Sequence, residues 1–201
     1  MTMHITRRNF LKITGLGGAA LASSVGYGAT DWIISMEQQN KAIVSRWFKE
    51  FWGNPWNPEI VDELAAPDML MQYSLHEPRR GREDIKAFMT NFRRAFPDLN
   101  FWGTADLIAE GDYVVGRWKG GGTHIGSAFN DFRVGSLPEN SGRKMLFTGT
   151  TVLRIDNGRI TEEIGLDDGV TALRQLGLIS DTGPTEKCGV GVLEPGPILG
   201  I

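Results

Sequence analysis

Cysteine and histidine are scarce in this sequence, and their scarcity excludes several kinds of site. The only cysteine, Cys188, cannot form an internal disulfide, and the three histidines show no zinc-ligand spacing. Glycine-rich phosphate loops, dinucleotide fingerprints and haem-attachment motifs are also missing. We therefore predict a protein with no metal site and no cofactor.

Positive charge is limited as well. The chain has 21 basic and 24 acidic residues. Residues 1–28 contribute three of the basic residues and no acid, which leaves 18 against 24, a net charge of about −6. An acidic chain of this kind is a poor partner for nucleic acid or an anionic membrane. Its length suits one domain with a sizeable core.

The N-terminus has an unusual pattern. A basic segment precedes a weakly apolar run rich in glycine and alanine; it reads Thr6-Arg7-Arg8-Asn9-Phe10-Leu11-Lys12. This pattern resembles a twin-arginine export signal. We predict a signal peptide over 1–28, a domain over 29–179 and a Gly/Pro-rich tail over 180–201. The predicted location is periplasmic or otherwise extracytoplasmic, with the twin-arginine translocase as a partner during export. Retention of the signal as an anchor stays open.

Hydrophobic periodicity predicts helices first and strands afterwards. Apolar and aromatic residues recur at helical spacing over 36–52 and 82–96. Shorter helices are expected over 58–64 and 169–176, and strands over 69–74, 99–110, 113–125, 144–155 and 159–166. This order predicts an α+β fold in which a curved antiparallel sheet wraps around helices to form a cone. The cone would hold an internal pocket.

Several segments, in this order, resemble the SnoaL-like polyketide cyclase/ester cyclase family, which has the nuclear-transport-factor-2-like cone fold. They include KAIVSRWFKEFW, RGREDIKAFMTNFRRAFPDL and LFTGTTVLRIDNGRITEEIGLDD, and the likeness spans roughly residues 40–179. The resemblance implies cofactor-free acid/base chemistry and a homodimer. It also implies an aspartate and a histidine on neighbouring strands, but this chain has Gly165 and Thr151 at those positions.

Glu163 is the candidate replacement for the missing acid. A three-residue loop over 156–158 would place Thr151 opposite Glu163 and Gly149 opposite Gly165. Strand alternation then directs Glu163, and further along Asp167, toward the cone, where burial would raise the pKa of the Glu163 carboxyl. The alternative is a solvated Glu163 at a strand end. Asp168 is expected to cap the last helix.

The remaining candidates are histidines and aromatic residues. His76 follows the predicted strand 69–74 and His124 lies at the end of the predicted strand 113–125, and each can act as a base or ligand-orienting group or simply stabilise a turn or loop. Residues expected to bind a ligand, with core packing as the alternative, are Tyr73, Trp102, Trp118, Thr151, Phe88 and Phe92. The outward sheet face is expected to be apolar and to form a homodimer through Leu146, Val152, Ile160, Ile164 and Leu166.

Two functions remain open at this point. One is an exported enzyme that cyclises, isomerises or hydrolyses a small apolar carbonyl compound by proton transfer. The other is a non-catalytic module that holds an apolar ligand or a partner, which the glycine at position 165 favours.

Overall fold

The structure, a computed structural model, describes residues 27–180, and the side chains of residues 36–180. The predicted signal peptide, except for its last two residues, lies outside this part of the chain, as do Cys188 and the tail beyond Ser180. The helices are α1 (Tyr27–Trp47), η1 (Phe48–Trp52), α2 (Ile60–Leu64), α3 (Arg82–Ala95) and α4 (Gly169–Gln175). The strands are β1 (Ala65–Gln72), β2 (Arg79–Arg80), β3 (Asn100–Gly103), β4 (Ile108–Glu110), β5 (Tyr113–Thr123), β6 (Lys144–Asp156) and β7 (Arg159–Asp167).

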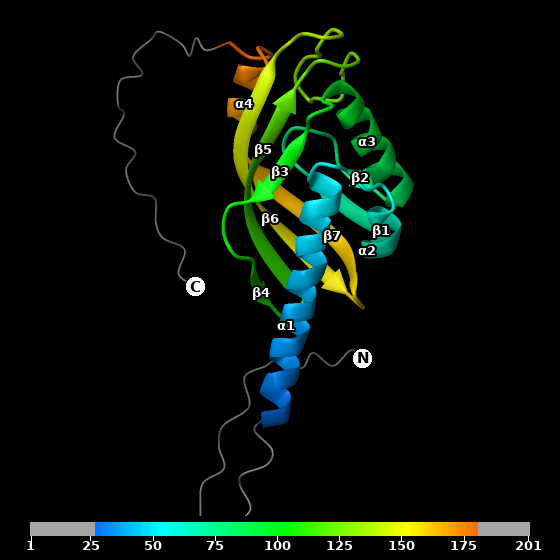
Figure 1. The fold of residues 1–201 in the computed structure, drawn as a ribbon, viewed down its shortest axis with the longest axis vertical. Helices are drawn as coiled ribbons and strands as arrows, with labels where there is room; N and C mark the ends of the chain where they lie inside the picture. Colours follow the sequence, from blue (N-terminus) through cyan, green and yellow to red (C-terminus); the bar gives the residue numbers. More distant parts are fainter. Residues whose placement is uncertain (1–26, 181–201) are drawn as a thin grey trace, which may run out of the picture.

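The seven strands form one curved sheet in the order β2-β1-β7-β6-β5-β3, with β4 also paired to β5. All pairs are antiparallel except β1 and β7, which are parallel. In Figure 1, α1 crosses in front of the sheet, α2 and α3 lie to its right, and α4 lies beside β6. The predicted α+β fold, a curved sheet around helices, is confirmed.

The strand expected over 99–110 is interrupted. Gly103 of β3 pairs with Trp118, and Ile108 of β4 pairs with Val115. Residues 104–107 therefore span the distance that residues 116–117 cover on β5, and the chain loops away from the sheet between the two strands.

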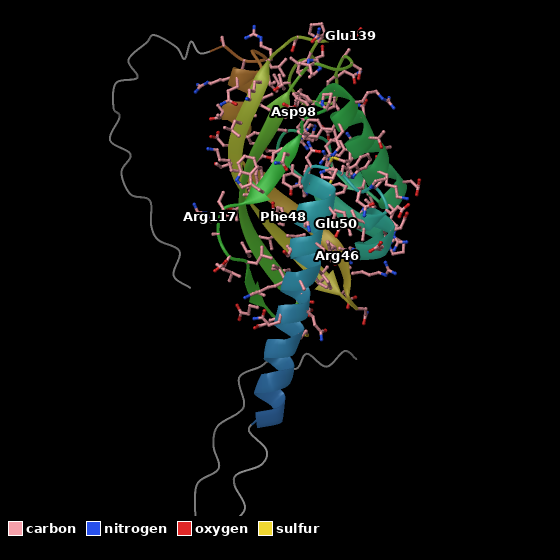
Figure 2. The ribbon with its side chains drawn as sticks, viewed as in Figure 1. Arg46, Phe48, Glu50, Asp98, Arg117 and Glu139 are labelled. Atoms are coloured by element: carbon pink, nitrogen blue, oxygen red, sulfur yellow. The ribbon has the colours of Figure 1, made fainter. Side chains whose placement is uncertain are left out.

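The first helix ends in a π-helical turn, η1, that the sequence periodicity did not predict. Figure 2 shows Arg46 and Glu50 on the side of this helix toward α2, where Arg46 bonds both Glu50 and Glu63. Phe48 lies toward the sheet and is buried. The helix α3 is amphipathic, with a buried stripe of Ile85, Phe88, Met89 and Phe92. Pro97 follows its last turn.

The β6–β7 hairpin differs from the predicted register. Asp156 pairs with Arg159, so the loop contains only Asn157 and Gly158, both with positive φ (50° and 74°). A two-residue turn of this kind suits right-twisted strands. A bulge beyond Ile160 then inserts one extra residue into β7.

This bulge decides which way Glu163 faces. A tight turn alone would direct Glu163 outward, but the extra residue reverses the alternation and returns it to the interior. Glu163 pairs with Leu153, and Thr151 pairs with Gly165, so the predicted pairings were wrong by two residues. Ile160 precedes the bulge, and the two-residue turn pairs it with the buried Ile155, so Ile160 is buried and, contrary to the prediction, does not belong to the outer face.

The outer face of the sheet still exposes apolar side chains. Leu146, Val152, Ile164 and Leu166 are exposed by 39% to 80%. No helix within residues 27–180 is long and apolar enough to cross a membrane.

Candidate active site

A buried carboxylate lies at the centre of the cone. Glu163 is fully buried, and its Oε2 accepts a hydrogen bond from Trp47 Nε1 at 2.8 Å. Its Oε1 accepts from Trp52 Nε1 at 2.8 Å and from the Tyr73 hydroxyl at 2.6 Å. All three donors are neutral, and Glu163 makes no salt bridge within residues 36–180. Burial raises the pKa of the Glu163 carboxyl, while the three hydrogen bonds oppose that rise.

The π-helical turn explains why two indoles reach one carboxylate. Trp47 and Trp52 are five residues apart, and in a regular α-helix they would point in different directions. A π-helical turn, with its i→i+5 hydrogen bonds, is wider and brings residues five apart closer to the same side of the helix. Arg93 holds the end of this turn, donating to the carbonyl oxygens of Phe51, Trp52 and Gly53.

The hydrogen bonds around Glu163 form a chain with one direction. An indole can only donate, so Trp118 Nε1 donates to Thr151 Oγ1 at 2.8 Å. The Tyr73 hydroxyl uses its one proton in the hydrogen bond to Glu163. The Thr151 hydroxyl must therefore be the donor in the hydrogen bond between Thr151 and Tyr73, at 3.0 Å. The order is Trp118, Thr151, Tyr73, Glu163, and each proton has one acceptor. Satisfied buried networks of this kind fix side-chain positions strongly.

Beside this chain is a cavity of about 20 Å³, which has room for about one water molecule. Its lining is mostly aromatic: Phe48, Trp52, Tyr73, Leu75, His76, Phe92, Phe101, Trp118, Phe147 and Asp167. Three side chains in this lining can exchange protons, namely Tyr73, His76 and Asp167. Glu163 and Thr151 do not line the cavity. Glu163 contacts it only through Trp52 and Tyr73.

His76 is a neutral imidazole inside an aromatic cage. Its ring packs against Phe88, Phe92, Phe129 and Phe132. Its Nδ1 lies 3.2 Å from the backbone oxygen of Asp131 and must donate to it, so Nε2 carries the free electron pair. Burial is the main reason that the pKa of His76 falls to about 4. The imidazole is therefore a base, not a cation, at neutral pH.

Asp167 connects the cavity to the surface. It lines the cavity and also an open groove of about 380 Å³, which is bordered by the middle of β5, the middle of β6 and the end of β7. Its carboxylate accepts a hydrogen bond from the Ser74 hydroxyl, and burial raises its pKa. The neighbouring Asp168 has the separate role that the sequence indicated. It caps α4 by accepting from the Thr171 backbone N–H at 3.2 Å.

Of the other predicted residues, Phe92 and Trp118 reach the cavity, and the rest lie outside it or pack behind it. His124 is buried, with Nδ1 2.9 Å from Ser141 Oγ and Nε2 2.9 Å from the Ser127 carbonyl oxygen, so it orders its own loop. Trp102 is 45% exposed and borders an outer groove. Phe88 packs behind His76, whereas Phe92 and Trp118 reach the cavity. Within residues 36–180 no three or more potential metal ligands come together.

The sequence interpretation missed the indole donors to Glu163. These donors, Trp47 and Trp52, belong to the apolar and aromatic pattern over 36–52, and nothing in that pattern marks an i→i+5 turn. One feature of the sequence could have indicated them. Glu163 was predicted to face the cone, and a buried carboxylate needs hydrogen-bond donors, which the two tryptophans of the opening helix can supply.

Comparison with known proteins gives the family. Residues 42–176 match the family described as SnoaL-like polyketide cyclase, which covers more than half of the chain. The chain belongs to the SnoaL-like polyketide cyclase family. Membership supports a cyclase-like or isomerase-like role without a cofactor, in general terms. No curated protein matches the chain.

Solved structures of the same fold are numerous. One from Jannaschia sp. CCS1, described as a SnoaL-like polyketide cyclase, is 22% identical with a TM-score of 0.59, covering 72% of this chain and 96% of its own. IdmH from Streptomyces antibioticus, described as a polyketide cyclase, is 28% identical with a TM-score of 0.52, covering 69% and 99%. A protein with a ketosteroid isomerase-like fold from Catenulispora acidiphila is 21% identical with a TM-score of 0.54, covering 71% and 97%.

Proposed function

We propose that the chain is a cofactor-free enzyme that cyclises, isomerises or hydrolyses a small apolar carbonyl compound by acid/base catalysis. The observation that supports this most is the meeting of Tyr73, His76 and Asp167 in one apolar cavity backed by Glu163. Burial lowers the pKa of His76 to about 4 and raises the pKa of Tyr73 above its usual value, so at neutral pH the imidazole is free to accept a proton and the phenol keeps one to donate.

His76 is the proposed base. Its Nε2 electron pair takes a proton from the carbon next to the substrate carbonyl; the electrons of that C–H bond form a carbon–carbon double bond, and the π electrons of the carbonyl move onto its oxygen. The resulting enol or enolate is the common intermediate for isomerisation and for carbon–carbon ring closure. Asp167, which reaches both the cavity and the surface groove, exchanges protons with solvent.

Tyr73 is the proposed donor to the substrate oxygen, and the protonation of Glu163 controls it. With Glu163 ionised, the Tyr73 proton is held by that carboxylate at 2.6 Å. With Glu163 protonated, the carboxyl can donate to Tyr73, which frees the Tyr73 proton for the substrate. Glu163 therefore acts through Tyr73 and is a positioning residue. Burial raises the pKa of Glu163, which favours the protonated state relative to a solvated glutamate.

Hydrogen–deuterium exchange tests this without knowledge of the natural substrate. Cyclohexanone and 1-tetralone would be incubated with the protein in D2O, and loss of the α-proton followed by NMR. We expect exchange above the buffer rate, and a loss of about 10²-fold or more for Tyr73→Phe and for His76→Gln. The matched control is Asp168→Asn, which keeps the α4 cap and should keep the rate. Full activity in Tyr73→Phe would contradict the assignment.

A non-catalytic binding role is the second candidate, and the size of the cavity favours it. A space of about 20 Å³ does not hold a carbonyl substrate unless side chains move. No exchange with either ketone, together with tight binding of an apolar compound, would support this role instead.

We also propose export and dimerisation as the setting of this function. Residues 1–28 would direct twin-arginine export to the periplasm or another extracytoplasmic location. The exposed apolar sheet face would form a homodimer.

A further inference from the structure

A second hollow, much larger than the cavity, lies on the other side of Phe48. It has a volume of about 830 Å³, within the usual range for small-molecule sites. One wall is the helix side that carries Lys41, Ser45 and Phe48, which the spacings of four and three residues align. The opposite wall consists of β3, residues 105–107 and the middle of β5. We call this hollow the helix groove.

The helix groove is positively charged in an otherwise acidic chain. Lys41, Lys49 and Arg117 border it, and Asp106 is the only acid in its lining. Within residues 36–180 none of these three cations makes a salt bridge or a side-chain hydrogen bond. Glu50, which follows Lys49, is bound to Arg46 on the side toward α2 (Figure 2). The cations therefore remain available to a ligand.

The helix groove and the inner cavity share two side chains. Phe48 and Phe101 line both spaces, so these rings form the partition between them. Gly116 lies under the partition; a Cβ there would come within 3.2 Å of the Phe48 ring. Because the cavity has room for only about one water, a substrate has to be held mainly outside it, and of the two grooves that share residues with the cavity the helix groove is the larger.

We propose that the helix groove binds the acidic end of an amphiphilic substrate, whose apolar carbonyl part passes Phe48 and Phe101 to reach His76 and Tyr73. This inference rests on the proposed function for the reacting end. It specifies the substrate class as an apolar carbonyl compound bearing one anionic group. The lysines select the anion, and the aromatic partition selects the apolar part.

Two fluorescent probes with nearly the same apolar body test the charge selection. 1-Anilinonaphthalene-8-sulfonate carries an anionic group, and N-phenyl-1-naphthylamine lacks it. We expect the anionic probe to bind more tightly, with an affinity that weakens as salt rises. The Lys41→Gln/Lys49→Gln variant should lose about tenfold in affinity for the anionic probe and less than about twofold for the neutral one. The matched control, Lys119→Gln/Lys144→Gln on β5 and β6, should change neither.

A blocking variant tests the location. Ser45→Trp places a large ring in the helix groove at an exposed position whose side chain makes no hydrogen bond within residues 36–180, and it should abolish binding of both probes. Near-UV circular dichroism would verify that the variants are folded. Equal affinity for the two probes, no effect of the lysine changes, or undiminished binding in Ser45→Trp would each overturn the inference. The ketone exchange assay does not depend on the lysines, so its result separates failure of this inference from failure of the proposed function.

Discussion

The Tyr73 ring occupies the space that a side chain at Gly165 would need. A Cβ at position 165 would lie 2.1 Å from Tyr73 Cε1, far inside van der Waals contact. Position 165 is where the family resemblance expects an aspartate. In this chain the Tyr73 ring fills that space, and its hydroxyl donates to the carboxylate of Glu163, two residues before position 165.

Gly165→Ala should therefore destabilise the protein through overpacking, by about 1–3 kcal/mol in urea unfolding. In a Tyr73→Ala background the same change should cost less than about 0.5 kcal/mol, because the ring it meets is gone. An equal loss of unfolding free energy in the two backgrounds would show that a side chain at position 165 does not clash with the Tyr73 ring.

Glu163→Gln tests the convergence of three donors on one carboxylate. A glutamine has a single acceptor oxygen, and its NH2 group would face either the Trp47 indole or the pair formed by Trp52 and Tyr73. At least one buried donor loses its acceptor, so we expect a loss of about 1–3 kcal/mol in unfolding free energy. Glu162→Gln, at the neighbouring partly exposed position, should stay within about 0.5 kcal/mol of wild type. Unchanged stability of Glu163→Gln would contradict the donor arrangement.

His76 should make the fold sensitive to acid. Its pKa is about 4 in the folded state against 6.5 for the free side chain, so the unfolded state binds more protons between these values. The stability that the neutral imidazole provides is complete above pH 6.5 and is lost as pH falls toward 4. Asp131, Arg79 and Arg133 are the charged groups that act on it.

The measurement compares wild type with His76→Phe at pH 7 and pH 4. Wild type should lose on the order of 3 kcal/mol more than the variant over this interval. If both proteins lose the same unfolding free energy between pH 7 and pH 4, a group other than His76 causes the acid sensitivity.

The inward direction of Glu163 was predicted from the sequence, although its partner was not. The prediction used a three-residue loop, whereas the hairpin has a two-residue loop followed by a bulge in β7. Both arrangements give the same alternation, so Glu163 faces the cone in each, but the pairing differs by two residues. Alternation is a local property of a strand. The position of a bulge depends on packing along the whole sheet, here the burial of Ile160.

The π-helical turn lay beyond sequence reasoning for a similar reason. Apolar spacing over 36–52 fits a continuous α-helix. The turn is stabilised by contacts from distant parts of the chain: Glu163 binds Trp47 and Trp52, and Arg93 binds the last carbonyls. The helices and most strands follow from local periodicity, whereas the site depends on these long-range hydrogen bonds.

The apolar outer face of the sheet leads to a prediction about assembly. Wild type should sediment as a dimer at micromolar concentration. Ile164→Glu would bury an unpaired charge in the interface, at a cost of several kcal/mol, and should sediment as a monomer or aggregate. Lys49→Glu, on η1 on the opposite side of the sheet, is the control and should remain dimeric. A monomeric wild-type protein would refute the interface.

The N-terminal pattern predicts export through recognition of two adjacent arginines. Replacing Arg7 and Arg8 with lysine keeps both positive charges and the apolar run after them, so general attraction to a membrane surface is unchanged. Lysine does not reproduce the planar, multiply donating guanidinium, and a receptor that reads arginine should reject it. We expect the double variant to accumulate in the cytoplasm at full length, while Lys12→Arg is exported like wild type. Fractionation with a tail-specific antibody would measure both. Equal periplasmic recovery of the double variant would show that this segment is not read as a twin-arginine signal.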